Sequence, residues 1–183
     1  AETMPPEQPV PSFGRYQPTP LYSEAVTTSQ YLTMRDGARL AISFTRPSHN
    51  GKDIDGRFPV IWQHALAFSA PGILLLNHVG AMPGDYNAVP SLAYHGYVGV
   101  QVARRGHGPA FGKRRGYKDR SETYDAYEFI DWLSAQSWST GAAGIYGCSN
   151  TGSASMHACG HGSECASESS LGWMPATLLS GNA

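Results

Sequence analysis

With 183 residues, the chain is long enough for one domain with a proper core and too short for two large ones. Charged residues make up 15% of the chain and the net charge is -1, which argues against binding to nucleic acid or an acidic membrane surface. No apolar run approaches the roughly 20 residues that cross a bilayer, and 3 cysteines do not indicate a disulfide scaffold. We therefore expect a soluble protein, and the compartment stays open between cytoplasmic and secreted or periplasmic.

A proline-rich segment opens the chain. Residues 1–28 carry six prolines among polar residues, a composition that favours an extended lead-in over a packed element. From residue 29 the pattern changes to that of strands, with one run over 29–34 and an alternating run over 38–45. Because Arg35-Asp36-Gly37 between them is a turn sequence, the two runs predict a β-hairpin.

Two continuous apolar runs, 58–64 and 97–103, predict strands that are buried on both faces of a sheet. The segment between them, with a short helix predicted at 89–95, is long enough for a crossover connection. We therefore expect the two strands to be parallel.

The clearest helix is predicted at 121–135, with Ser121 or Thr123 available as its N-cap. Its apolar residues recur at i, i+3, i+4 and i+7, the spacing of one helix face. These residues are Ala126, Phe129, Ile130 and Leu133. A third parallel strand at 142–147 and a small-residue helix at 150–158 follow. Alternation of strands and helices predicts an α/β fold with a mostly parallel sheet.

The sequence Gly147-Cys148-Ser149-Asn150-Thr151-Gly152 lies between this third strand and this last helix, the context of the nucleophile turn of α/β hydrolases. The nucleophile of such a turn has a strained backbone and needs small neighbours, which Gly147 and Gly152 provide. The helix N-terminus adds positive partial charge, and the backbone N–H of Asn150 is a candidate oxyanion donor. The turn predicts that Ser149 is a nucleophile; an ordinary loop serine is the alternative.

The chain also resembles a known family. The segments MRDGARLAISFTRP, FPVIWQH, LAYHGYVGVQVARRGHGPAFG and DAYEFIDWLSAQSWSTGAAGIYGCSNTG are similar, in this order, to the X-Pro dipeptidyl peptidases, cocaine esterase and α-amino-acid ester hydrolases. The similarity covers roughly residues 29–157. The resemblance implies the N-terminal part of an α/β-hydrolase domain over 29–158. It also implies cleavage of acyl esters or X-Pro peptide bonds through a Ser-Asp-His triad, with Ser149 as the nucleophile.

Some positions depart from the family pattern. Asn150 stands where the family usually has Tyr, and Ala103 stands where an Asp commonly precedes the Arg-Gly pair. The family's second oxyanion donor is typically a Tyr hydroxyl just after the strand that here ends at His64. Residues 65–67 offer no such hydroxyl, so the second donor is left unassigned.

No triad acid or base is identifiable for Ser149. In this fold the partners follow the nucleophile on later strands, and the 34 residues after Ser149 are too few to supply them. His157 lies eight residues beyond Ser149, which is about 12 Å along a helix axis. Residues 159–183 show no strand or helix period, and both truncation of a longer enzyme and loss of the reading frame explain such a tail.

Other candidates have weaker support. Four zinc-competent side chains are crowded into nine residues, which strains a tetrahedral site, so no metal or other cofactor is predicted. These side chains are His157, Cys159, His161 and Cys165. The basic residues of 104–115, around His107, predict a solvated surface loop near the carboxyl ends of the strands, because a P-loop arrangement is absent. His64 is expected to be a hydrogen-bonded structural histidine.

The sequence therefore predicts a serine hydrolase that acts through an acyl-enzyme on a small-molecule ester or peptide substrate. We expect weak or no activity from this chain as written, because no group is assigned to take the proton of Ser149. The alternative is a non-catalytic fragment or a small binding module that keeps the half-sheet. The acyl group, the preference for ester or amide, and the oligomeric state stay open.

Overall fold

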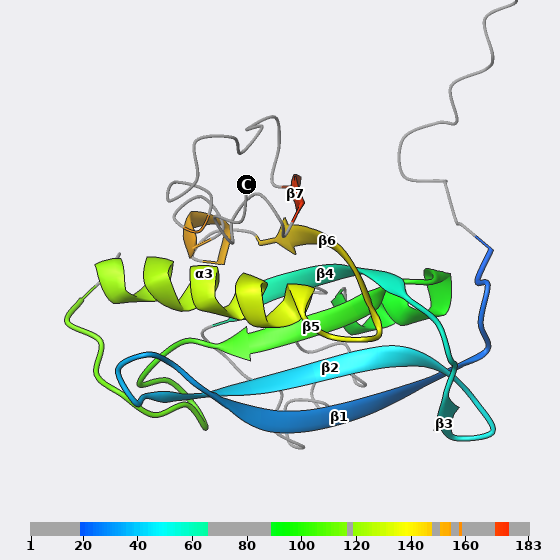
Figure 1. Ribbon diagram of the computed structural model, residues 1–183, viewed down its shortest axis with the longest axis horizontal. Helices are drawn as coiled ribbons and strands as arrows, with labels where there is room; N and C mark the ends of the chain where they lie inside the picture. Colours follow the sequence, from blue (N-terminus) through cyan, green and yellow to red (C-terminus); the bar gives the residue numbers. More distant parts are fainter. Residues whose placement is uncertain are drawn as a thin grey trace, which may run out of the picture.

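The computed structural model of the protein describes residues 19–65, 89–116, 119–147, 151–154, 158 and 171–175. Within these ranges seven strands form one sheet, with the order β1-β2-β5-β4-β6-β7 and with β3 paired to β2. Figure 1 shows helix α3 lying across one face of the sheet. The predicted α/β class is confirmed.

The N-terminal hairpin is longer than the sequence pattern indicates. Strand β1 (Glu24–Thr33) pairs antiparallel with β2 (Arg39–His49) along its whole length, and the short β3 (Lys52–Asp53) pairs with the end of β2. The predicted turn is present, and Gly37 has a φ of 80°, a conformation that favours glycine. Residues 24–28, which the composition placed in the lead-in, belong to β1.

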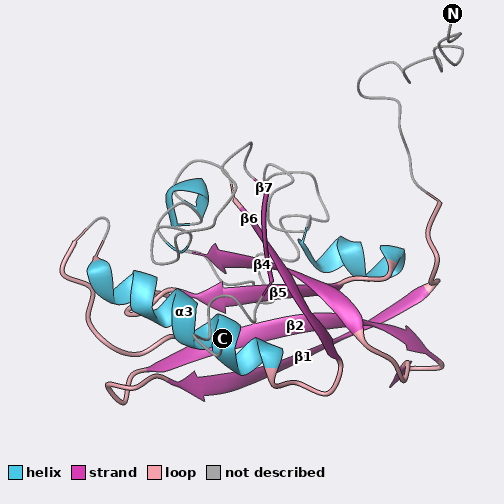
Figure 2. Ribbon diagram, turned by 45° about the horizontal axis from the view of Figure 1, so that its top comes forward, coloured by secondary structure: helices cyan, strands magenta, loops and turns pink. Residues whose placement is uncertain are grey.

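The centre of the sheet is parallel, and its flanks are antiparallel. Strand β4 (Phe58–Ala65) runs parallel to β5 (Val98–Ala103) on one side and to β6 (Ser139–Tyr146) on the other. Figure 2 shows the arrows of β4 and β5 pointing the same way. Strand β2 pairs antiparallel with β5, and β7 (Leu171–Pro175) pairs antiparallel with β6. The predicted parallel pairing is therefore present among the three central strands. The hairpin and β7 join the sheet with antiparallel pairing.

A helical segment covers one face of β5. Residues 89–91 are helical and continue into the 3-10 helix η1 (Leu92–His95), at the predicted position. A Cβ atom on Gly99 would lie 2.1 Å from the carbonyl oxygen of Val89. Because real Cβ atoms do not approach backbone so closely, Gly99 is what allows this segment to pack directly on the strand.

Helix α3 (Arg120–Ser134) covers the other face of the sheet, and its four predicted apolar residues are all buried. Its N-cap is Asp119, not Ser121 or Thr123: the Asp119 carboxylate accepts hydrogen bonds of 2.9 Å from both the backbone N–H and the hydroxyl of Ser121. None of the described helices has the length and hydrophobicity needed to span a bilayer.

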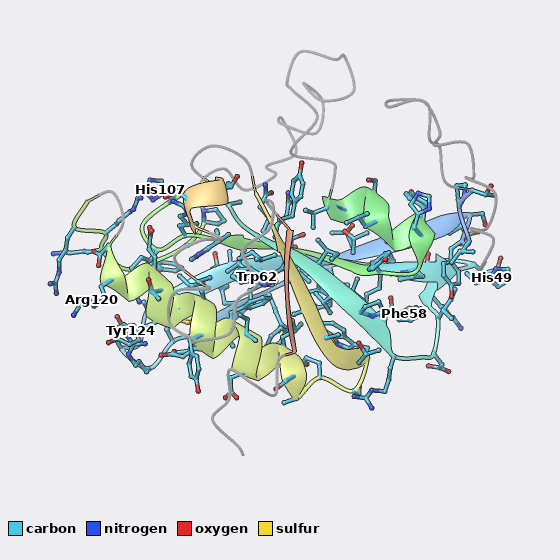
Figure 3. All side chains as sticks on the ribbon, turned by 90° about the horizontal axis from the view of Figure 1, so that it is seen from above. His49, Phe58, Trp62, His107, Arg120 and Tyr124 are labelled. Carbon is cyan, nitrogen blue, oxygen red and sulfur yellow. The ribbon has the colours of Figure 1, made fainter. Side chains whose placement is uncertain are left out.

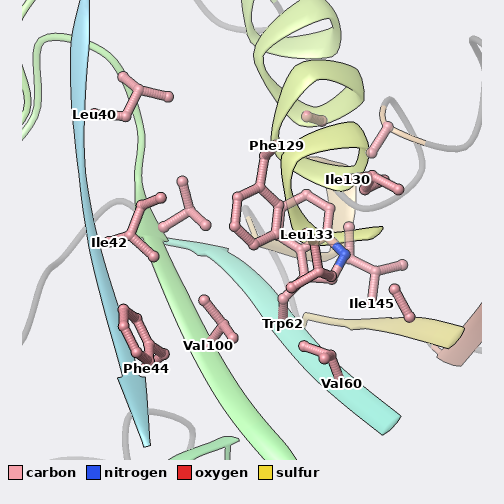
Figure 4. Packing of buried hydrophobic residues seen from close by; sticks show 14 of the residues in the cluster. Leu40, Ile42, Phe44, Val60, Trp62, Val100, Phe129, Ile130, Leu133 and Ile145 are labelled. Carbon is pink, nitrogen blue, oxygen red and sulfur yellow. The ribbon is translucent and has the colours of Figure 1, made fainter. Parts of the chain in front are cut away.

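The core lies between α3 and the central strands. The ring of Trp62, which is fully buried, lies 4.8 Å from that of Phe129, and Figure 4 shows Phe129, Ile130 and Leu133 packing toward the strand residues. In Figure 3, Trp62 lies near the centre of the molecule and Tyr124 at its periphery. Burial of large aromatic rings makes this contact a main source of stability.

Candidate active site

The candidate site lies at the edge of the sheet where the three parallel strands end. Strands β4, β5 and β6 end at Ala65, Ala103 and Tyr146. Because they are parallel, their carboxyl ends meet at the same edge, which is where ligands bind in open α/β sheets. The predicted nucleophile turn follows β6 directly and therefore starts at this edge.

The two glycines of this turn touch each other. A Cβ atom on Gly147 would lie 2.4 Å from the carbonyl carbon of Thr151 and 2.5 Å from its oxygen. A Cβ atom on Gly152 would lie 3.0 Å from the carbonyl oxygen of Gly147. The chain thus bends sharply between the end of β6 and the helical residues 151–154, and the need for glycine at position 147 is met.

The residues at the tip of the bend carry the predicted chemistry. Cys148, Ser149 and Asn150 lie outside the described residues. The nucleophile role of Ser149 and the oxyanion role of the Asn150 N–H therefore stay predictions. The residues with these proposed roles come between Gly147 and Thr151, whose backbones are in contact.

Arg104 holds the carboxyl end of β4. Its backbone N–H donates to the carbonyl oxygen of Ala65 at 3.0 Å, and its Nε donates to the carbonyl oxygen of His64 at 3.2 Å. Arg104 is only 1% exposed. It therefore connects the ends of two neighbouring strands just before the segment in which the resemblance predicts a second oxyanion donor. Residues 66 and 67 of that segment lie outside the described part of the chain.

His64 is a buried, neutral side chain. Burial, together with the smaller effect of the positive charges of Arg104, Arg114 and Arg105, lowers its pKa to about 3. The residue is 1% exposed, and its Nε2 atom has no hydrogen-bond partner, so the hydrogen bond expected from the sequence is absent at Nε2. At neutral pH an imidazole of such low pKa is a poor general base.

The two arginines that follow β5 are buried, which differs from the prediction made from the sequence. Arg104 and Arg105 were expected in a solvated loop, but they are 1% and 4% exposed. Only the later part of the loop fits the expectation, since Lys113 and Arg115 are exposed. The reason is that buried carboxylates on α3 offer partners to the first two arginines.

Arg105 joins three elements. Its Nε and Nη2 donate to the two carboxylate oxygens of Asp125 on α3, at 2.7 and 2.5 Å, and its Nη1 donates to Asp36 in the hairpin turn at 2.7 Å. The hydrogen bonds to Asp125 raise the pKa of the guanidinium, because they favour its charged form. A two-pronged pair of this kind fixes orientation as well as distance.

Glu122 is the second buried acid on α3. Its carboxylate lies 2.6 Å from Nε of Arg114 and 3.9 Å from Nη1 of Arg104. The Arg114 contact is an ion pair without the alignment of a hydrogen bond. Burial raises the pKa of Glu122, and the two arginines oppose that shift. Acids at positions 122 and 125 lie on the same face as the apolar stripe of α3, and that placement is the sequence signal that could have revealed buried cationic partners.

These ion pairs hold the loop after β5 against α3. The other candidate side chains of the tail lie outside the described residues. These are His157, Cys159, His161 and Cys165. In the part of the chain that the structure describes, no group of three or more His, Cys, Asp or Glu side chains is arranged to hold a metal ion.

Comparison with known proteins assigns a family to this arrangement. The profile of the X-Pro dipeptidyl-peptidase (S15) family matches residues 36–165. A protein of Mycobacterium bovis that is named as a candidate serine esterase is 32% identical over an alignment of 143 positions, and the match covers 73% of this chain. A solved CocE/NonD family hydrolase from Staphylococcus aureus covers 71% of this chain with a TM-score of 0.56 and 28% identity.

A solved α-amino acid ester hydrolase has the same fold over 85% of this chain, with a TM-score of 0.54 and 19% identity. The chain spans only part of each of these proteins. It covers 22% of the mycobacterial protein, 24% of the staphylococcal hydrolase and 26% of the α-amino acid ester hydrolase.

Proposed function

Because the chain belongs to the X-Pro dipeptidyl-peptidase (S15) family, whose fold is that of the α/β hydrolases, we propose that it carries the nucleophile of a serine hydrolase. The nucleophile is Ser149, and the substrate is a small acyl ester or an X-Pro peptide. The observation that carries the proposal is the backbone contact between Gly147 and the residues 151–152 at the carboxyl end of β6. In α/β hydrolases a tight bend between a strand and a helix carries the nucleophile.

The proposed reaction has two steps. The hydroxyl oxygen of Ser149 attacks the carbonyl carbon of the substrate, and the oxyanion that forms accepts a hydrogen bond from the backbone N–H of Asn150. Collapse of this intermediate breaks the bond from carbon to the leaving group, releases the alcohol or amine with the proton that Ser149 lost, and leaves an acyl group on the serine. Water then attacks the acyl-enzyme and releases the acid. The helix that follows Gly152 adds positive partial charge near the oxyanion.

The proposal includes weak turnover by this chain alone. No acid or base has been assigned to Ser149, and the described His64 is buried and too weakly basic at neutral pH. A serine without a general base is a poor nucleophile, because its proton must leave as the bond to carbon forms. Oxyanion stabilisation by itself still gives measurable reactivity in such sites.

A fluorophosphonate probe tests the assignment. We expect slow labelling of the folded chain that is lost in Ser149→Ala and kept in Ser137→Ala, a matched change at an exposed serine. Folded protein that takes no label would support the alternative, a non-catalytic fragment or binding module. Steady hydrolysis of p-nitrophenyl acetate that disappears in Ser149→Ala would contradict the proposed weak turnover.

A further inference from the structure

We propose that three exposed cations between β5 and the start of α3 select substrates with a negative charge at a distance from the reacting carbonyl group. These cations are Lys113, Arg115 and Arg120, and together they are called the basic rim. The inference rests on the proposed function and adds to it the charge of the preferred substrate.

Positive charge is concentrated in one stretch of the chain. Residues 104–125 contain seven lysines and arginines but three acids, although the whole chain has a net charge of -1. Two of the three acids, Glu122 and Asp125, are buried in ion pairs with arginines. The third, Asp119, accepts a hydrogen bond of 2.8 Å from the backbone N–H of Arg115 and offsets part of the remaining charge. The side chains of the basic rim take part in none of the described ion pairs, so their charge faces the solvent.

Ion pairs tie this loop to the carboxyl end of β4. One carboxylate oxygen of Glu122 lies 2.6 Å from Nε of Arg114, and the other lies 3.9 Å from Nη1 of Arg104. Arg104 in turn donates to the carbonyl oxygen of His64 at 3.2 Å. Arg114 therefore fixes the loop against the edge of the sheet that holds the candidate active site, and the rim residues on either side of it stay exposed.

The sheet order sets the distance from the loop to the nucleophile turn. Strand β4 lies between β5 and β6, so the ends of β5 and β6 are two strand spacings apart, which is about 10 Å. Figure 2 shows β4 and β5 pointing toward the end of the molecule where α3 begins, and Figure 3 shows Arg120 at the border of that end. The preferred substrate therefore carries its anionic group about 10 Å from the carbonyl carbon that Ser149 attacks.

A small anionic substrate fits this distribution of charge better than an extended polyanion. The stretch 104–125 carries a net charge of +4 in a chain of net charge -1, so the other residues together carry -5. A polyanion that reaches beyond the basic rim would meet this negative charge, whereas a small molecule would feel mainly the rim. Such a local field raises the concentration of an oppositely charged substrate at the site and weakens as salt screens it.

Two fluorophosphonates of equal length, one ending in a carboxylate and one in a neutral amide, test the proposal by their rates of labelling Ser149. We expect the ratio of the anionic to the neutral rate to fall about fivefold between about 0.01 M and 1 M salt, because three unit charges at about 10 Å are screened. In low salt, Lys113→Glu should lower the ratio about threefold, since it replaces one of these charges by its opposite.

Lys52→Glu is the matched control. It makes the same change of charge at an exposed residue that pairs with His49, and Figure 3 shows His49 at the border opposite Arg120. This variant should leave the ratio of the two rates unchanged, because the charge lies far from the basic rim.

Other results would overturn the inference. A ratio that does not depend on salt, or that falls equally in Lys113→Glu and Lys52→Glu, would exclude selection by the basic rim and leave the proposed function intact. Absence of labelling by both probes would overturn the proposed function and this inference together. Retention of the chain on heparin at about 0.15 M salt would assign the basic rim to an extended polyanion instead. If Lys113→Glu fails to fold, Arg115→Glu takes its place, and the salt dependence of the parent decides in either case.

Discussion

Replacement of Gly147 by alanine tests the geometry on which the active-site argument depends. The new Cβ atom would lie 2.4 Å from the carbonyl carbon of Thr151, whereas ordinary contacts begin at 3.4 Å. The neighbours are backbone atoms, so the start of the helix has to move by about 1 Å, and forcing extra volume into a packed site typically costs about 1–3 kcal/mol. A displacement of about 1 Å can also lower reactivity about 100-fold.

Two measurements follow the change. Urea denaturation should show a free energy of unfolding that is lower by about 1–3 kcal/mol, and fluorophosphonate labelling of Ser149 should slow by about two orders of magnitude. Gly116→Ala is the matched control, because a Cβ atom there meets nothing within 4 Å. It should stay within about 0.5 kcal/mol of the parent. If Gly147→Ala is as stable as Gly116→Ala, the bend is looser than described and the reasoning fails. The stability measurement does not depend on catalytic activity.

Three further predictions concern α3. Phe129→Ala should lower the free energy of unfolding by about 3–5 kcal/mol, because the ring is fully buried against Trp62; equal urea midpoints for parent and variant would contradict this. Asp125→Asn should cost about 3–5 kcal/mol in the same assay, because it leaves Arg105 buried without its main partner, and a loss below about 1 kcal/mol would show that Asp36 suffices. Asp119→Ala should cost about 1 kcal/mol through loss of the N-cap. The hydrogen bonds from Ser121 and Arg115 lower the pKa of Asp119 from 3.8 to about 2. Its stabilising effect is therefore complete above pH 3.8 and is lost as the pH falls through 2, and acid titrations of parent and variant should converge in that window.

The sequence determined the elements whose pattern is local. The apolar stripe of α3 identified its buried face because residues three and four apart share one side of a helix. The two continuous apolar runs identified β4 and β5, and the length between them required parallel pairing. The two glycines around Ser149 indicated a tight bend, and the family resemblance was readable from short segments in order.

Only the tertiary structure decided which charged residues are buried. Arg105 finds Asp125 and Asp36, which are 20 and 69 residues away, and no local pattern reports a contact over such separations. The same holds for the first five residues of β1 and for β7, which become strands because a neighbour offers backbone partners. Periodicity shows which face of an element is apolar, but a buried charge depends on which distant group balances it, because its desolvation has to be offset by a partner in space.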